Sequence, residues 1–388
     1  MKINNRVDRI IKKYHTPCYI FFDEEIRSRI VLIRDIVGED PGICYAIKAN
    51  PFIVPLMKKY VDRFEACSHG EYKILVERGI EKDRIVYSGV NKSYEIMNEL
   101  YSEGFSGICT IESVIQFEHL KKVCEENKCK SRVLIRATSG NQFGVAEDDL
   151  RMIIGECTSV ENMDLAGIHF FSGTQKKDVG IIKDEVGKIR NLCDSISKKL
   201  GTNINEIEYG PGLFADYFGA GNDTEYINEA LLAIKNGLRG FKVTLELGRF
   251  LAYKCGKYYT SVVDKKYIGG KQYVIVDGGI HQVNYYGQLL GIRVPDIKLY
   301  HDGIDSPDEM ESIICGSLCT VNDILVKKWK GNIQMGDIFE FNDAGAYSCT
   351  EGGLLFLSRD LPAMIAVDEE GEILLRDHTP TYVLNGGA

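Results

Sequence analysis

The chain has 388 residues, of which 44% are hydrophobic and 27% are charged, and this is the composition of an ordinary globular protein. Its formal net charge of −9 disfavours nucleic acid and anionic membrane surfaces as its main partners. No apolar run reaches the roughly 18 residues that a membrane-spanning helix needs. The N-terminus lacks the apolar core of a secretory signal, so we expect a cytoplasmic protein with no membrane partner.

The twelve cysteines form no CxxC pair. Cys124 and Cys129 are close in sequence, but no second ligand pair accompanies them, so we expect neither a zinc site nor another bound metal. Cysteines of cytoplasmic proteins are usually reduced, and we expect most of these to be small buried apolar residues.

Short apolar runs alternate with helix-length amphipathic stretches through the first 250 residues. Eight runs are predicted strands, at residues 44–48, 63–66, 85–88, 107–110, 132–136, 165–170, 206–209 and 243–247. The stretches between them include predicted helices at 72–78, 113–126 and 181–200. Parallel strands need a crossover connection, which helices supply, so this alternation predicts an α/β fold, a (β/α)8 barrel of the TIM type.

The active site of such a barrel lies at the C-terminal ends of its strands. The residues that the sequence places there are Lys48, Glu65, Ser88, Arg136, His169, Gly210 and Glu246. A lysine, an acid and a glycine-rich turn around one barrel mouth indicate a carbonyl cofactor that carries a phosphate, namely pyridoxal 5'-phosphate (PLP).

The pattern changes after about residue 250, where predicted strands follow one another without helices between them. These strands are predicted at residues 257–265, 272–277, 311–315, 338–342, 364–367 and 372–376. Consecutive strands with Gly and Asp turns predict an antiparallel β domain, which residues 16–22 could join as a further strand. We therefore expect a barrel over residues 24–250 and a β domain formed by residues 1–23 and 251–388.

Lys48 lies in the segment YAIKANP, at the end of the first predicted barrel strand. Burial disfavours an ammonium ion and lowers the pKa of a lysine, and so favours the neutral amine that forms a Schiff base. By itself, Lys48 could equally be a lysine with a buried stem whose amine reaches solvent.

Glu246 and Arg249 follow the eighth predicted strand, in LELGRF. A carboxylate beside a pyridine nitrogen keeps that nitrogen protonated and makes the ring a strong electron sink. An arginine at this end of the barrel can hold a phosphate. The alternative is a structural Glu–Arg pair.

Glycine-rich and hydroxyl-bearing segments follow the sixth and seventh predicted strands. Gly210 and Gly212 flank a proline in the turn GPG, and barrels commonly bind phosphate through the loops after strands seven and eight. In HFFSGTQ, the aromatic side chains could stack on a cofactor ring and Thr174 could bond its phosphate, although Phe170 and Phe171 could equally belong to the core.

Taken in order, these segments resemble the fold-type III PLP-dependent decarboxylases. That family includes diaminopimelate, ornithine and arginine decarboxylases and shares its barrel with alanine racemase. The resemblance covers about residues 19–366 and implies an alanine racemase-like fold and a homodimer with shared active sites. It implies that Lys48 forms the Schiff base with PLP, that Glu246 faces the pyridine nitrogen and that Arg249 contacts the phosphate.

The resemblance also extends to other segments. FEACSHGE resembles the second barrel strand of the family and places Glu65 beside the cofactor. EYGPGLF resembles the phosphate loop, with Gly210 and Gly212. CGSLCTVND resembles the segment whose cysteine enters the neighbouring subunit's active site, which gives Cys319 a catalytic role, and DAGAY resembles the segment whose tyrosine contacts phosphate, which gives Tyr347.

Further implied roles concern Arg136, which would position cofactor or substrate, and His169 beside the ring. Substrate-side groups are implied near Tyr286 and Arg293, and also at Thr320 and Asp323.

Phe171 departs from the family pattern, because it stands where the family has a histidine that stacks on the ring. Its ring can still stack, but the hydrogen bonding of an imidazole is lost. His169 lies two residues earlier. Strand residues two apart point to the same face but lie at different positions along the strand, so the resemblance does not give His169 the stacking role. Thr174 can still offer its hydroxyl to the phosphate.

Thr320 is the second departure, because decarboxylases of basic amino acids have an acid directly after the catalytic cysteine, where it reads a distal amine. A threonine cannot pair that charge. HFFSGTQ and LCTVND are instead similar to the subgroup of the butirosin-pathway L-glutamyl-[acyl-carrier protein] decarboxylase, and to siderophore-pathway decarboxylases of citryl-diamino acids.

We therefore expect a PLP-dependent decarboxylase of an α-amino acid with a conjugated or acylated side chain, either a small molecule or bound to a carrier protein, in natural-product biosynthesis. The alternatives are a decarboxylase of a free amino acid of the diaminopimelate or ornithine type, an amino-acid racemase, and a non-enzymatic PLP carrier or regulator. A glutamate rather than an arginine facing the pyridine nitrogen favours decarboxylation over racemisation.

Overall fold

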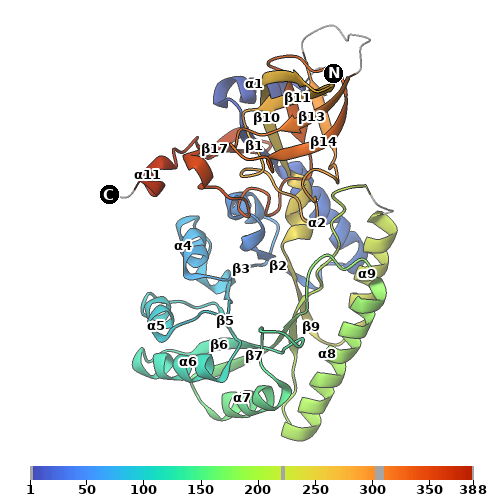
Figure 1. Ribbon diagram of the computed structural model, residues 1–388. Coiled ribbons are helices and arrows are strands. Elements are labelled where there is room, and N and C mark those ends of the chain that lie inside the picture. Colours follow the sequence, from blue (N-terminus) through green and yellow to red (C-terminus); the bar gives the residue numbers. More distant parts are fainter. Residues whose placement is uncertain (1–2, 220–222, 302–309, 387–388) are drawn as a thin grey trace. The chain divides into compact units, whose positions relative to one another are not determined.

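The computed structural model describes residues 3–219, 223–301 and 310–386. The chain forms two compact units (Figure 1). The barrel unit consists of Arg29–Ala215 and Asn222–Phe250, and the β unit consists of Met1–Ser28, Asp216–Gly221 and Leu251–Ala388. We describe each unit by itself.

The barrel unit contains a closed barrel of eight parallel strands, arranged in chain order. The strands are β2 (Gly42–Ala46), β3 (Arg63–Ala66), β4 (Ile85–Tyr87), β5 (Ile108–Ile111), β6 (Ser131–Arg136), β7 (Met163–Phe171), β8 (Glu206–Gly210) and β9 (Lys242–Leu247). The barrel closes where β9 pairs with β2, with Cys44 opposite Glu246. The predicted (β/α)8 barrel is thereby confirmed.

Helices connect the barrel strands, and serine residues define several of their starts. The helices are α2 (Asp23–Val37), α3 (Val54–Met57), α4 (His69–Glu77), α5 (Tyr94–Ser102), α6 (Val114–Glu126), α7 (Glu147–Ser159), α8 (Val179–Leu200), α9 (Asp223–Gly237) and α10 (Arg249–Ala252). Ser68, Ser93 and Ser113 precede α4, α5 and α6, and each side chain accepts a hydrogen bond from the backbone N–H three residues later. Such caps satisfy N–H groups that a helix start otherwise leaves without partners.

The first barrel strand is shorter than predicted, and this changes the position of Lys48. β2 ends at Ala46, and Lys48 lies in a short 3-10 turn, Ile47–Ala49. Asn50 precedes a proline and is extended, as the steric clash with the proline ring requires, and its side chain caps the next turn. Lys48 therefore lies on the loop at the C-terminal end of the barrel rather than inside a strand.

The β unit contains a nine-stranded sheet with the order β14-β13-β11-β10-β1-β16-β17, in which β15 pairs with both β10 and β12. The strands are β1 (Cys18–Phe22), β10 (Gly256–Ile268), β11 (Lys271–Val276), β12 (Ile297–Tyr300), β13 (Met310–Cys315), β14 (Ile324–Gly331), β15 (Ile338–Phe341), β16 (Ala363–Val367) and β17 (Glu372–Arg376). Two helices, α1 (Asn5–Tyr14) and α11 (Tyr382–Asn385), complete the unit.

The sheet is mostly antiparallel, but β1 pairs with β16 and β11 pairs with β13 in parallel. The predicted antiparallel β domain is confirmed as a mostly antiparallel sheet that contains these two parallel pairs. Parallel neighbours need long connections, and the whole barrel separates β1 from β16. Strands β12 and β14 were also missed, because β12 has only four residues and β14 ends in a charged stretch.

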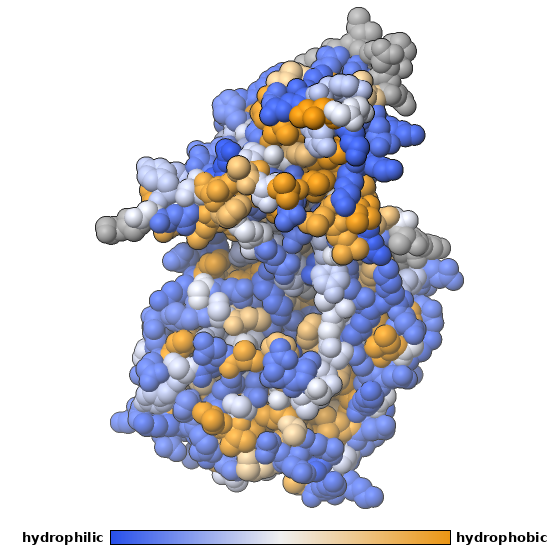
Figure 2. Space-filling model, viewed as in Figure 1, coloured by the Kyte–Doolittle hydropathy of each residue, from blue (hydrophilic) through white to orange (hydrophobic). Residues whose placement is uncertain are grey.

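Surface character agrees with the composition. On the face of the barrel unit seen in Figure 2, hydrophilic residues predominate and apolar residues form small separate patches. Among the described residues, we find no helix with the length and apolar character needed to cross a lipid bilayer.

Candidate active site

Lys48 Nζ lies among side chains from β3 and β9 at the C-terminal end of the barrel. It is 2.7 Å from Glu65 Oε2, 3.4 Å from Glu246 Oε1 and 3.4 Å from Cys67 Sγ. The Lys48 side chain is 34% exposed, whereas Glu65 is 2% exposed. The amine can thus be reached from solvent while one of its acidic partners lies in the barrel interior.

Glu246 has a partner on each carboxylate oxygen. Its Oε1 faces Lys48, and its Oε2 is 2.8 Å from His169 Nε2, a contact buried inside the barrel. Burial opposes the ionisation of Glu246, but Lys48 and the hydrogen bond from His169 hold its pKa well below its ordinary value. Burial also disfavours the imidazolium of His169, yet the bond to Glu246 leaves the pKa of His169 above its ordinary value. Glu246 is therefore ionised at neutral pH.

Glu208 brings a third carboxyl group to this cluster. The polar atoms of His169, Glu208 and Glu246 lie within 4.8 Å of one another, on the adjacent strands β7, β8 and β9. Burial raises the pKa of Glu208 to about 7. Glu65, Glu208 and Glu246 thus share Lys48 and His169, and Glu208 Oε2 also lies 3.5 Å from Nη1 of Arg63.

Arg136, the last residue of β6, belongs to a neighbouring charged group. Its Nη1 donates to Glu112 Oε2 at 2.9 Å, and Lys92 Nζ lies 4.0 Å from the other oxygen of Glu112. Burial lowers the pKa of Lys92. The ring centroid of Phe171 is 5.9 Å from the Arg136 guanidinium and 6.0 Å from Lys48 Nζ, so this ring lies close to both cations.

Two loops with the predicted phosphate-binding residues are in contact. Gly212 has a φ of +61°, and a Cβ added to it would lie 1.9 Å from the carbonyl oxygen of Gly173. Only glycine permits this close approach. Gly210 ends β8 against the ring of Phe171, and Thr174 is exposed. Arg249 starts the short helix α10 and is buried.

The remaining predicted residues lie in the β unit. Cys319 is exposed, in the loop between β13 and β14. Asp323 in the same loop is buried, and its carboxylate accepts the backbone N–H groups of Ile280 and Leu318 at 2.9 and 2.7 Å. These bonds occupy both oxygens, which fits a residue that holds the loop rather than one that contacts substrate.

Other predicted residues of the β unit differ in exposure. Thr320, next to Cys319, is half-buried, and its backbone N–H donates to the carbonyl of Leu318. Tyr286 and Arg293 are exposed. Tyr347 has a φ of +64°, which is strained for a bulky side chain and is found mainly at functional sites.

Four residues of the barrel cluster were missed from the sequence: Cys67, Lys92, Glu112 and Glu208. Glu112 directly follows β5 and Cys67 follows β3, so the strand-end rule that found Lys48 could have found both. Glu208 is two residues before Gly210 and therefore faces the same side of β8. Lys92 follows β4 by five residues, and no local pattern marks it.

A family comparison identifies this arrangement. Residues 23–253 match the model of the pyridoxal-dependent decarboxylase, pyridoxal binding domain. The chain belongs to the pyridoxal-dependent decarboxylases. It is a PLP-dependent enzyme of this family, as the resemblance of its motifs implied.

Curated relatives of this decarboxylase cover nearly the whole chain. The 2-[(L-alanin-3-ylcarbamoyl)methyl]-2-hydroxybutanedioate decarboxylase of Staphylococcus aureus is 24% identical over 94% of this chain and 98% of its own. The diaminopimelate decarboxylase of Campylobacter jejuni is 25% identical over 94% and 93%. The L-glutamyl-[BtrI acyl-carrier protein] decarboxylase of Niallia circulans is 25% identical over 92% and 90%.

Solved structures agree in fold. Diaminopimelate decarboxylase from Helicobacter pylori, complexed with L-lysine, gives a TM-score of 0.84 at 21% identity, over 97% of this chain and 98% of that one. The enzyme from M. jannaschii, also with L-lysine, gives 0.84 at 19% identity, over 97% and 93%. These likenesses concern the fold alone.

The residues at the barrel mouth fit PLP. The carboxylate of Glu246, which is buried and ionised beside Lys48, suits a ligand with a protonated pyridine nitrogen. The tight contact at Gly212 holds backbone groups of two loops side by side, and backbone N–H groups in such turns suit a phosphate. The donor set therefore matches both ends of the cofactor.

Proposed function

We propose that this decarboxylase acts on an α-amino acid whose side chain is conjugated or acylated, either bound to a carrier protein or as an intermediate of a siderophore or antibiotic, and releases an amine and carbon dioxide. The observation that carries the proposal is Thr320. An acid at this position would pair a distal substrate ammonium, and threonine has no charge with which to do so.

Two relatives support this substrate class. The staphylococcal enzyme is named for an alanine joined through its side chain to a hydroxybutanedioate, and the Niallia enzyme for a glutamyl group on an acyl-carrier protein. Diaminopimelate decarboxylases are similar at the same level of identity, so a free amino acid with a distal amine is the second candidate.

Within the barrel, we assign the cofactor's ring and reactive end to five residues. Lys48 would bind the cofactor through its amine, and Glu65 orients that amine through its 2.7 Å hydrogen bond. Glu246 would hold the proton at the pyridine nitrogen, and His169 keeps the Glu246 carboxylate ionised and in place. Phe171 would cover one face of the ring, in place of a stacking histidine.

We assign the phosphate of the cofactor to a second group of residues. Gly210 and Gly212 would offer backbone N–H groups, Thr174 its hydroxyl, and Arg249 and Tyr347 side-chain donors. Arg136, held by Glu112, would position cofactor or substrate from the end of β6.

We also propose a homodimer in which Cys319 of the partner subunit completes the site. The exposure of Cys319 on its loop supports this role, since its thiol can be approached from outside its own chain. Tyr286 and Arg293, both exposed, would contact substrate with Thr320. Asp323 would act by holding the Cys319 loop.

The mechanism follows from these roles. Bound PLP supplies the sink for the electron pair that carbon dioxide leaves behind on the substrate Cα. Glu246 keeps that sink strong by remaining ionised. Cys319 would give its thiol proton to Cα and regain a proton from water, and Lys48 is the amine that would hold the cofactor between turnovers. An arginine in place of Glu246 would favour racemisation.

Carbon dioxide release from a panel of substrates tests the proposal. The panel contains free glutamate, ornithine, lysine and diaminopimelate, glutamyl-carrier protein, and 2-[(L-alanin-3-ylcarbamoyl)methyl]-2-hydroxybutanedioate. We expect turnover of a conjugated substrate only. Rapid turnover of a free basic amino acid would reject the Thr320 argument, and exchange of enantiomers without carbon dioxide would indicate a racemase.

A matched pair of variants sharpens this test. Thr320→Asp should raise turnover of free ornithine or diaminopimelate relative to the conjugated substrate. Val321→Asp adds the same charge at the next position, which is 89% exposed, and should leave the preference unchanged.

A further inference from the structure

The two loops assigned to the phosphate are joined along their length. Lys176 N donates to the carbonyl oxygen of Gly212 at 3.0 Å. The side-chain amide of Gln175 accepts from the backbone N–H of Ala215 at 2.7 Å and donates to its carbonyl at 3.1 Å. With the contact between Gly173 and Gly212, these bonds make residues 172–176 and 210–215 a single structural piece.

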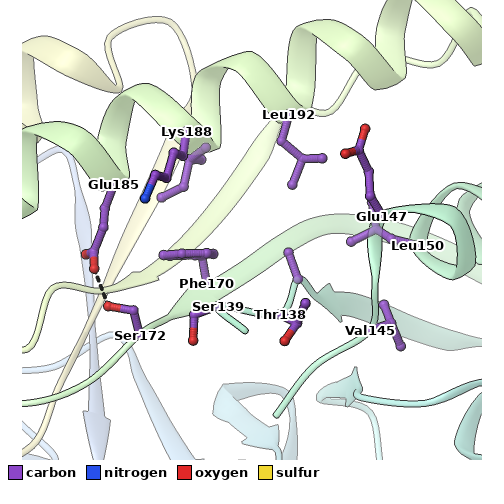
Figure 3. A pocket seen from close by; sticks show the side chains of 12 residues that line it. Thr138, Ser139, Val145, Glu147, Leu150, Phe170, Ser172, Glu185, Lys188 and Leu192 are labelled. Atoms are coloured by element: carbon purple, nitrogen blue, oxygen red, sulfur yellow. Dashed lines mark hydrogen bonds between the residues drawn. The ribbon is translucent and has the colours of Figure 1, made fainter. Parts of the chain in front are cut away.

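Glu185 on α8 holds this piece from the outer side of the barrel wall. One carboxylate oxygen accepts from the hydroxyl of Ser172, as Figure 3 shows. The other accepts from Lys176 Nζ at 2.7 Å and from the hydroxyl of Tyr209 at 2.6 Å. Ser172 and Lys176 flank Thr174, and Tyr209 directly precedes Gly210. One carboxylate therefore anchors both ends of the first loop and the start of the second.

Hydrogen bonds complement the packing around Glu185. A cavity of about 330 Å³ lies against Ser172 and Glu185, and its other walls include Phe170 and Lys188 (Figure 3). Ser172 and Glu185 therefore lack packing neighbours on the side that faces the cavity. Glu185 itself is buried, and a buried carboxylate is tolerated only when donors satisfy it. Its three donors therefore define where the loops lie.

We propose that Glu185 is a positioning residue for the cofactor phosphate, setting the distance between the Thr174 loop and the Gly210–Gly212 turn through Ser172, Lys176 and Tyr209. The inference rests on the proposed function, because those two loops are the proposed phosphate site. Glu185 touches neither cofactor nor substrate in this role, and it acts only through the loops.

Affinity for PLP compared with pyridoxal, which lacks the phosphate, tests this role. The two affinities are measured by titrating the apo-protein and following the visible absorbance. Glu185→Gln should weaken PLP binding by roughly tenfold, as loss of an outer-shell partner commonly does, and leave pyridoxal binding unchanged. Ser172→Ala and Tyr209→Phe each remove one donor and should give smaller losses of the same kind.

Glu229→Gln is the matched control. Glu229 on α9 pairs with Lys183 of α8 at 2.7 Å, but both side chains are 55% exposed. The same chemical change on the surface should leave both affinities unchanged.

The outcomes separate this inference from the proposed function. Unchanged PLP affinity in Glu185→Gln, or equal losses for PLP and pyridoxal, overturns the positioning role. Thr174→Val and Gly212→Ala probe the loops directly. If these variants also leave the affinity for PLP relative to pyridoxal unchanged, the phosphate assignment fails. If they weaken PLP alone while Glu185→Gln does not, the loops bind phosphate and only the role of Glu185 is rejected. Should Glu185→Gln not fold, the positioning role is decided by Ser172→Ala and Tyr209→Phe, through the ratio of their affinities for PLP and pyridoxal.

Discussion

The two ends of the barrel use the same residue types in different proportions. At the N-terminal end, Glu206 meets three cations: Arg63 at 2.6 Å, Arg132 at 2.6 Å and Lys242 at 3.2 Å. Burial opposes its ionisation, but these cations, led by Arg63, lower the pKa of Glu206.

At the C-terminal end the proportion of acids is higher. Glu65 and Glu246 share the single amine of Lys48, with Glu208 and His169 beside them. A carboxylate surrounded by its own counterions is complete as a structural element, whereas carboxylates that share one amine can also hold the cationic ring nitrogen of a ligand. This difference in charge indicates that the N-terminal end of the barrel has a structural role and that the C-terminal end holds the functional site.

The most severe change to the site end is Lys48→Ala. It removes the amine that holds the cofactor, so we expect turnover to fall by roughly a thousandfold or more. The visible absorbance of protein-bound cofactor should disappear. If that absorbance survives in protein freed of unbound PLP, Lys48 is not the attachment point.

Glu246→Gln tests the charge at the same end. A neutral amide cannot keep the pyridine nitrogen protonated, so kcat should fall by roughly a hundredfold while the free energy of unfolding of the apo-protein stays close to wild type. Steady-state kinetics and thermal unfolding measure the two effects. A large loss of stability with unchanged kcat would make Glu246 a scaffold residue.

Glu206→Gln is the matching change at the scaffold end. It leaves three cations around a neutral group, so the free energy of unfolding should fall by about 2–3 kcal/mol, with kcat and PLP affinity unchanged. Denaturant unfolding provides the measurement. Because the folded pKa of Glu206 is lowered, the stabilisation is present above the unfolded pKa of about 4.3 and is lost as the pH falls through the folded value.

Glu208 should give an effect of at most the same size, with the opposite pH dependence. Its folded pKa of about 7 exceeds its unfolded value, so its contribution to stability is full below about 4.3 and is lost as the pH rises through 7. Glu208→Gln removes this loss. The variant should therefore gain up to roughly 2–3 kcal/mol on wild type between pH 5 and pH 8. If Glu208→Gln and wild type have equal unfolding free energies across that range, Glu208 is ionised throughout it.

Much of the barrel could be predicted because its signals are local. Strand period and helical crossovers are local patterns, and the C-terminal strand ends then bring Lys48, Glu65 and Glu246 together. The chain has to be closed into a barrel before contacts between distant strands appear, and for this reason the pairing of His169 with Glu246 was not foreseen. Their separation of 77 residues carries no sequence pattern.

Other features depended on context that sequence patterns do not carry. Lys48 was placed in a strand because its neighbours are apolar, but β2 ends at Ala46 and Lys48 lies in the 3-10 turn that precedes Asn50 and Pro51. Glu185 lies in the middle of a helix that reads as an ordinary amphipathic segment. Only its burial and its three donors distinguish it from the exposed glutamates nearby.

Strand β7 has a different environment on each of its two faces. His169 and Phe171 face the cofactor cluster, whereas Phe170 lines the cavity beside α8. A substitution that enlarges or fills the cavity at Phe170 therefore also acts on the strand that supports Phe171. For protein engineering, residues 169–172 are one unit, and libraries that vary them together will sample productive combinations that single substitutions miss.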